Sequence, residues 1–171
     1  MLDKYLPRDT DGWSWTLAQI SDIKDLVDLS YSMYNNEIDT IFTTDLGLLA
    51  RNIAQGIITQ TYNPLDEQII CARDTAGRMI AWAWMERGGY VTYAPEEIAE
   101  AKFAHVALDL SPRKRITLLA QILQQWELWA TICNVPVIVS TTIRRDQTAF
   151  LHLHEQAGYE IRGSFGYKRI L

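Results

Sequence analysis

The chain has 171 residues, of which 48% are hydrophobic and six are tryptophan, and its net charge at pH 7 is −5. This length and composition predict a single folded domain with its own core, and they exclude a disordered chain. The acidic balance disfavours a protein coated with DNA-binding charge, although it permits a local basic patch.

The sequence shows no signal for export or membrane insertion. The first residues, MLDKYLPRDTDGW, contain no apolar signal-peptide core, and no apolar run approaches the ~18 residues of a membrane span. Cys71 and Cys133 each lie in an apolar stretch, which favours two reduced core thiols over a disulfide or a metal site. We therefore expect a cytoplasmic protein.

The first half of the chain alternates helical and extended patterns. Residues 1–12 are polar and predict a flexible arm ahead of one domain spanning 13–171. Hydrophobic periodicity and turn residues then predict the following elements: a strand at Trp13–Leu17, a helix capped by Ser21, a helix capped by Thr43 or Thr44 that ends near Pro64, strands at Gln68–Arg73, Arg78–Glu86 and Tyr90–Tyr93 with a turn at Gly88–Gly89, and a helical first turn at Pro95–Glu97.

The second half predicts two parallel strands joined by a long helix. A helix between two strands of one sheet implies a right-handed crossover and parallel neighbours. The expected elements are a strand at Ala104–Leu110, a helix starting at Pro112 or Arg113 and stopped by Asn134 and Pro136, a strand at Val137–Ile143, a helix at Gln147–Ala157, and a hairpin of Tyr159–Arg162 with Phe165–Ile170. The order predicts an α/β fold with one mixed sheet and helices on both faces.

Two segments carry a resemblance to a known family. Leu108–Arg115, LDLSPRKR, looks like a strand end, a proline and an arginine ahead of a pyrophosphate loop. Gln147–Tyr159, QTAFLHLHEQAGY, looks like a last helix that ends in glycine and an aromatic residue. With the order of elements, they resemble the GNAT acyltransferase superfamily (GCN-five-related N-acetyltransferases), and the resemblance covers nearly the whole chain.

The resemblance implies an acyl-CoA N-acyltransferase fold in which two parallel strands splay apart and coenzyme A lies between them. Backbone groups around Leu108 and Leu110 would then hold the pantetheine arm and polarise the thioester carbonyl. Arg115, helped by Arg113, Lys114 and Arg144, would hold the phosphates of acetyl-CoA. A diphosphate needs backbone N–H donors, a helix dipole and cations together, which is why this arrangement suits it.

The chain departs from the family pattern at two places. In the register of the glycine-rich loop it has Ile116, Leu118 and Ala120, and the two larger side chains either narrow the phosphate cradle or point into the core. His154 stands where many members have a tyrosine acid, and histidine can donate a proton near neutral pH. The alternative for His154 is an ordinary helix residue without chemistry.

Two residues are candidates for the base that deprotonates an acceptor amine. They are His105, in the strand before the long helix, and Glu86, at the end of the preceding hairpin. The competing interpretation of both is a polar side chain at a strand end. A metal site formed by His152 and His154 is rejected, because residues two apart on a helix do not face each other.

These patterns leave three functions open. The first is transfer of an acetyl group from coenzyme A to an amine on a small molecule or a protein. The second is a catalytically silent, phage-type protein of this fold, acting by binding in a virion or on a host partner, because such relatives often lack the glycines and the tyrosine. The third and weakest is nucleic-acid binding through the cations Arg113–Arg115, Arg144 and Arg145.

Overall fold

The computed structural model describes residues 6, 12–37, 42–142 and 147–163. Its centre is a five-stranded sheet in the order β1-β2-β3-β4-β5. The strands are β1 (Trp13–Leu17), β2 (Glu67–Asp74), β3 (Met79–Tyr90), β4 (Glu97–Val106) and β5 (Val137–Ser140). The first four pair antiparallel, and β5 runs parallel to β4. The predicted mixed sheet is therefore confirmed.

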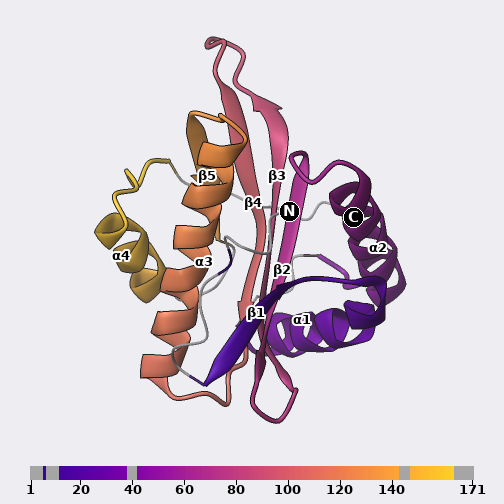
Figure 1. The fold of residues 1–171 in the computed structure, drawn as a ribbon. Helices are drawn as coiled ribbons and strands as arrows, with labels where there is room; N and C mark the ends of the chain where they lie inside the picture. Colours follow the sequence, from indigo (N-terminus) through magenta and orange to yellow (C-terminus); the bar gives the residue numbers. More distant parts are fainter. Residues whose placement is uncertain (1–5, 7–11, 38–41, 143–146, 164–171) are drawn as a thin grey trace.

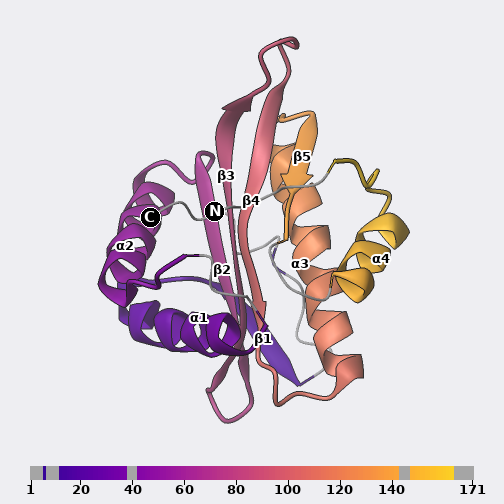
Figure 2. The same cartoon turned by 180° about the vertical axis from the view of Figure 1, so that it is seen from behind.

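Helices cover both faces of this sheet, as the sequence predicts (Figures 1 and 2). Helices α1 (Ile23–Glu37) and α2 (Leu46–Tyr62) lie on one face, and α3 (Pro112–Ile132) and α4 (Thr148–Gln156) lie on the other. A 3-10 helix at Ile20–Asp22 precedes α1. Among the described residues, no helix has the length and apolar character needed to cross a membrane.

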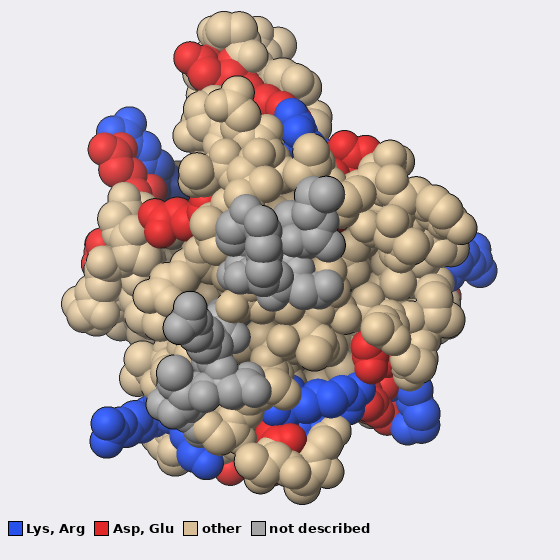
Figure 3. All heavy atoms as spheres, in the orientation of Figure 1, with Lys and Arg blue, Asp and Glu red and all other residues tan. Residues whose placement is uncertain are grey.

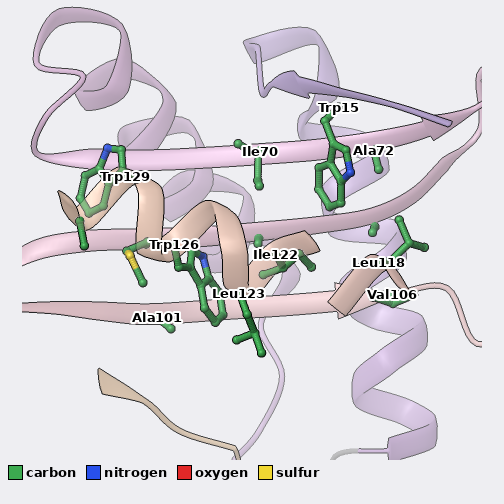
Figure 4. Packing of buried hydrophobic residues seen from close by; sticks show 14 of the residues in the cluster. Trp15, Ile70, Ala72, Ala101, Val106, Leu118, Ile122, Leu123, Trp126 and Trp129 are labelled. Atoms are coloured by element: carbon green, nitrogen blue, oxygen red, sulfur yellow. The ribbon is translucent and has the colours of Figure 1, made fainter. Parts of the chain in front are cut away.

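The larger core lies between α3 and the sheet (Figure 4). Trp126 and Trp129 of α3 are almost completely buried against the strands, as expected for aromatic residues that share one helix face. On the same side, the Gln121 side-chain oxygen accepts hydrogen bonds from the indole N–H groups of Trp13 and Trp15, at 3.0 and 2.8 Å. These two bonds tie the edge strand β1 to the long helix.

Helix α2 approaches the other face of the sheet closely at Gly56. A methyl group there would come within 2.8 Å of both the Trp84 ring and the Glu67 carboxylate. The Trp84 indole N–H donates to that carboxylate at 2.9 Å. Glycine is needed here because a side chain would push the helix off the sheet.

The helix starts differ from the prediction by a few residues. The 3-10 turn that leads into α1 is capped by Gln19 rather than Ser21. The side chain of Asp45, and not that of Thr43 or Thr44, caps α2 by accepting the N–H of Leu48 at 2.9 Å. Asp is among the preferred residues at this position, because its carboxylate satisfies an N–H that the helix leaves unpaired.

Two predictions between β3 and β4 are wrong. Gly88 and Gly89 do not turn the chain, because β3 continues through them to Tyr90. Gly88 has a φ of 98° and lies at a register shift, so the glycines form a bulge within a long hairpin. Pro95–Glu97 does not start a helix, since β4 begins at Glu97. The hairpin of β3 and β4 projects beyond the rest of the sheet (Figure 1).

The first strand of the parallel pair is formed largely by different residues from those predicted, whereas β5 lies within the predicted strand Val137–Ile143. Strand β4 ends at Val106, so the expected strand at Ala104–Leu110 is displaced towards the N-terminus. Residues 97–106 form this strand, whereas Leu108 and Leu110 follow in a turn that leads to α3. Helix α4 is close to its prediction, and Gly158 follows it with a φ of 87°.

The predicted C-terminal hairpin is not seen in the described residues. No strand is assigned to residues 159–163, and its second half, Phe165–Ile170, lies outside the described residues. The N-terminal arm, except for residues 6 and 12, also lies outside them. Both cysteines are buried and reduced, as expected.

Candidate functional site

Strands β4 and β5 stay together over only part of their length. Their parallel register pairs Ile98–Ala101 with Val137–Ser140. Strand β5 ends there, while β4 continues to Val106. Directly after the segment that pairs with β5, Lys102 of β4 has no partner in β3, which makes it the extra residue of a β-bulge. Such a bulge bends the strand that contains it. The two strands therefore diverge after Ala101 and Ser140.

A pocket with a volume of about 80 Å³ lies at this divergence and is open to solvent. One wall is formed by β4, the opposite wall by the end of β5, and helices α1, α3 and α4 each add one aromatic side chain. The lining residues are Tyr34, Ala101, Lys102, Phe103, Ala104, His105, Trp126, Ser140, Thr141, Thr142 and Phe150. The pocket thus lies at the carboxyl ends of two parallel strands, where open α/β sheets bind ligands.

His105 is held in one orientation on the β4 wall of this pocket. Its Nδ1 lies 3.1 Å from the Ser30 hydroxyl, which itself donates to the carbonyl of Leu26 at 2.7 Å. The hydroxyl proton is therefore engaged, so Nδ1–H of His105 is the donor, and in the neutral form of the ring the lone pair lies on Nε2. The rings of Tyr34 and Phe103 meet the imidazole edge to face, with centroids 5.9 and 5.3 Å away. A neutral histidine fixed in this way can accept a proton at Nε2.

His154 lies behind the opposite wall and is only 2% exposed. Its Nδ1 lies 2.9 Å from the carbonyl oxygen of Phe150, and its Nε2 lies 2.9 Å from the hydroxyl oxygen of Ser140. A carbonyl can only accept, so Nδ1 carries the proton. In the neutral ring, Nε2 then accepts from Ser140. Of these two residues, Ser140 lines the pocket and His154 does not.

Burial lowers the pKa of His154 below its ordinary value of 6.5, and the hydrogen bond to the Phe150 carbonyl offsets only part of this effect. The ring is therefore neutral at pH 7. The resemblance gives His154 the role of an acid, but a neutral ring has no proton at Nε2 to donate. His154 can act as an acid towards the pocket only after it has first accepted a proton through Ser140.

The lowered pKa of His154 predicts a loss of stability in acid. Below pH ~6.5 the unfolded chain binds a proton that the folded chain resists, so the free energy of unfolding falls as the pH falls through the folded pKa. Urea unfolding at pH ~7.5 and ~5.5 measures this difference. His154→Gln should reduce it, whereas His152→Gln, on the exposed side of the same helix, should not. An unchanged pH dependence in His154→Gln would contradict the assignment.

Glu86 is less suited to act as the base. Its carboxylate forms an ion pair with Lys102 at 2.6 Å, and Glu86 does not line the pocket. Lys102 contributes to the pocket wall, so Glu86 contacts a pocket residue but does not itself line the pocket. The structure therefore brings His105 and the Ser140–His154 pair together and leaves Glu86 at the edge.

The start of α3 differs from a glycine-rich phosphate loop. The helix begins at Pro112, and the Ser111 side chain caps it. The N–H groups of residues 116–120 lie inside the helix, where each N–H donates to a carbonyl four residues earlier. Leu118 is buried in the core (Figure 4), while Ile116 is 55% exposed. Neither of them lines the pocket, and the helix engages the backbone amides of this segment.

The predicted phosphate ligands are only partly brought together. Arg113 and Lys114 are exposed in the first turn of α3, and Arg115 is partly buried one residue later. Leu108 and Leu110 lie in the preceding turn and not on a strand edge, so the strand edge at the pocket is Ala101–His105. Arg144 and Arg145 lie outside the described residues.

Cationic and anionic side chains are interspersed on the face drawn in Figure 3. The nucleic-acid hypothesis depends on five cations. Arg113, Lys114 and Arg115 belong to the described part of the chain, and Arg144 and Arg145 lie outside it. Among the described residues, no group of three or more histidine, cysteine or acidic side chains could hold a metal ion.

Sequence reasoning did not find Ser140, Lys102, Tyr34 or Ser30. Each of them contributes to the pocket or orients a histidine at its wall. Ser140 lies in an apolar, β-branched run that only indicates a buried strand. Its partner is 14 positions later in the chain, and no local motif connects the two residues.

Comparisons with known proteins identify the fold. No protein-family model matches the sequence, and no curated protein sequence does either. Among solved structures, an aminoglycoside antibiotic 6'-N-acetyltransferase from Acinetobacter baumannii is 16% identical, with a TM-score of 0.66 over 93% of this chain and 99% of the other. A glucosamine-6-phosphate N-acetyltransferase from Arabidopsis thaliana is 9% identical, with a TM-score of 0.64 over 92% and 97%.

A third solved structure is a 6'-N-acetyltransferase, AAC(6')-Iy, in complex with the bisubstrate analogue CoA-S-monomethyl-acetylneamine. It is 16% identical, with a TM-score of 0.63 over 92% of this chain and 99% of the other. At these identities the similarity shows the fold alone. The chain therefore has the GNAT acyl-CoA N-acyltransferase fold, as its sequence predicts.

Proposed function

We propose that the protein transfers an acyl group, acetyl in the simplest case, from coenzyme A to an amine. The observation that carries the proposal is the pocket between the diverging strands β4 and β5, with His105 in one wall and Ser140, backed by His154, in the other. The fold supports the same reaction class, because the solved structures that it matches are N-acetyltransferases.

The residues present fit the thioester end of coenzyme A better than its diphosphate. The β4 edge from Ala101 to His105 offers backbone at the pocket wall, where a pantetheine arm could pair with it. The diphosphate would rely on the positive end of α3 and on the side chains of Arg113, Lys114 and Arg115. When bound, coenzyme A supplies an acyl group that is already activated as a thioester.

The chain's own residues account for the proton transfers. An amine acceptor enters as an ammonium ion and must lose a proton before it can attack. His105 accepts that proton at Nε2, while Ser30 keeps the ring in place through Nδ1. On the opposite wall, Ser140 lines the pocket, and its hydroxyl, bonded to His154, can transfer protons between the pocket and that histidine. The aromatic rings of Tyr34, Phe103 and Phe150 limit access of water.

A thermal-shift titration with acetyl-CoA tests the proposal. Ligand at a hundred times its dissociation constant should stabilise the fold by ~2.7 kcal/mol, which raises the melting temperature measurably. The double variant Arg113→Ala, Lys114→Ala should weaken the response, because it removes two cations from the proposed phosphate site. The matched control is Arg162→Ala, which removes an exposed cation paired with Glu160. The absence of any shift at millimolar acetyl-CoA would refute the proposal.

A second function is favoured by the start of α3. Because the amides of residues 116–120 are engaged in the helix, the chain lacks the backbone cradle that a diphosphate uses in this fold. This observation supports a catalytically silent protein that acts by binding a partner. In that case acetyl-CoA would give no thermal shift, and the wild-type protein would not acetylate any amine in a panel of acceptors.

A further inference from the structure

The Ser140–His154 pair has a geometry that direct amine attack does not require. The Ser140 hydroxyl oxygen and His154 Nε2 are 2.9 Å apart, and His154 Nδ1 is 2.9 Å from the carbonyl oxygen of Phe150. A hydroxyl, a base within hydrogen-bonding distance and a third group that orients the base are the three parts of an activated serine nucleophile. Here the third part is a backbone carbonyl from the same helix as the base.

The positions of the two residues suit these roles. Ser140 is the last residue of β5 and lines the pocket that an acyl carbonyl could enter, and its hydroxyl oxygen lies 2.9 Å from Nε2 of His154. His154 is buried behind it and packs against the rings of Phe150 and Tyr159, with centroids 4.2 and 4.9 Å away. These contacts and the two hydrogen bonds limit rotation of the imidazole, which holds Nε2 towards the serine.

We propose that Ser140 is a nucleophile that accepts a short acyl group from an activated ester or thioester, with His154 as its general base. This activity goes beyond the transfer proposed above, which needs no covalent intermediate on the protein. The apolar lining by Ala104, Trp126 and Phe150 suits a short acyl chain.

The chemistry balances with the groups present and water. The Ser140 hydroxyl oxygen attacks the acyl carbonyl carbon, and its proton passes to His154 Nε2. The bond from that carbon to the leaving oxygen or sulfur breaks, and the leaving group receives the proton. Water then attacks the acyl-Ser140 ester, His154 takes a proton from this water, and the proton returns to the Ser140 oxygen as the acid leaves. The net reaction is hydrolysis of the ester or thioester.

A fluorophosphonate probe tests the nucleophile without coenzyme A. Such a probe forms a stable phosphonyl ester with an activated serine and releases fluoride. We expect stoichiometric labelling of the native protein, located at Ser140 by peptide mass spectrometry, and no labelling of the unfolded protein. His154→Gln should slow labelling at least tenfold, while Thr131→Ala, which removes an exposed hydroxyl on α3 away from the pocket, should leave the rate unchanged.

Ser140→Ala should abolish the labelling, and a second variant keeps the test decisive if Ser140→Ala fails to fold. Ser140→Cys places a thiol beside His154, and this thiol should react with iodoacetamide faster than the buried Cys71 and Cys133. The added change His154→Gln should slow that reaction as well. Absence of a Ser140 adduct in the folded wild-type protein, or a labelling rate that does not depend on His154, would overturn the proposal.

The outcome separates this inference from the proposed transfer. Ser140 labelling without a thermal shift by acetyl-CoA would support the nucleophile and refute the transferase. A thermal shift with amine acetylation, but without Ser140 labelling, would refute the nucleophile and leave the transferase. Turnover of p-nitrophenyl acetate that is lost in Ser140→Ala would show that water completes the cycle.

Discussion

Trp129→Ala is expected to lower the free energy of unfolding by about 3–5 kcal/mol, because it removes a large, completely buried ring from the core between α3 and the sheet. The Trp129 side chain is 1% exposed, and its indole N–H donates to the carbonyl of Pro64 at 3.2 Å. The change thus leaves a cavity and also frees the loop after α2. Urea unfolding followed by circular dichroism measures the loss, with a fall of roughly 6–20 °C in melting temperature.

Two further variants separate packing from hydrogen bonding at this position. Trp129→Phe keeps most of the ring and loses the bond to Pro64, so we expect a smaller loss of about 1–2 kcal/mol. Gln124→Ala, on the exposed side of the same helix, should change stability by less than ~0.5 kcal/mol. A loss below ~1 kcal/mol in Trp129→Ala would show that Trp129 is not a central part of the core.

The order of strands and helices could be predicted because each element carries its own pattern. The alternation WSWTL and the apolar face of α3 both depend only on neighbours in sequence. The boundaries around β4 could not be predicted in this way. Gly88 and Gly89 are typical of a turn, but pairing of Gly89 with Ile98 across the hairpin keeps them in the strand. Long-range pairing thus overrides a local turn signal.

The same limit applies to the candidate site. The resemblance pointed to Leu108 and Leu110 as the strand edge, and β4 ends before both of them. The opening depends on the bulge at Lys102 and on the end of β5 at Ser140, and neither feature has a local sequence pattern. His105 and His154 could be chosen because histidine suits proton transfer at neutral pH. Their partners, Ser30 and Ser140, are brought to them only by folding.

His105→Asn is expected to lower kcat for amine acetylation by about 10²–10⁴, the usual contribution of a general base. An asparagine amide can still donate to Ser30 near the place of Nδ1–H, but it has no basic nitrogen at the place of Nε2. The thermal shift caused by acetyl-CoA should remain. Because alkali deprotonates the amine in solution, the rate of the variant should rise towards that of the wild type as the pH is raised, and steady-state kinetics from pH ~6 to ~10 would show this rise.

Glu86→Gln is the matched comparison, because Glu86 is the other candidate base that the sequence offers. Its carboxylate is paired with Lys102 outside the pocket, so the change should lower kcat less than tenfold and leave the pH profile in place. The amide also keeps the shape of the side chain, which limits structural effects on β3. If Glu86→Gln instead showed the large loss in kcat and His105→Asn did not, Glu86 would be the base that deprotonates the amine, and the assignment of His105 would be wrong.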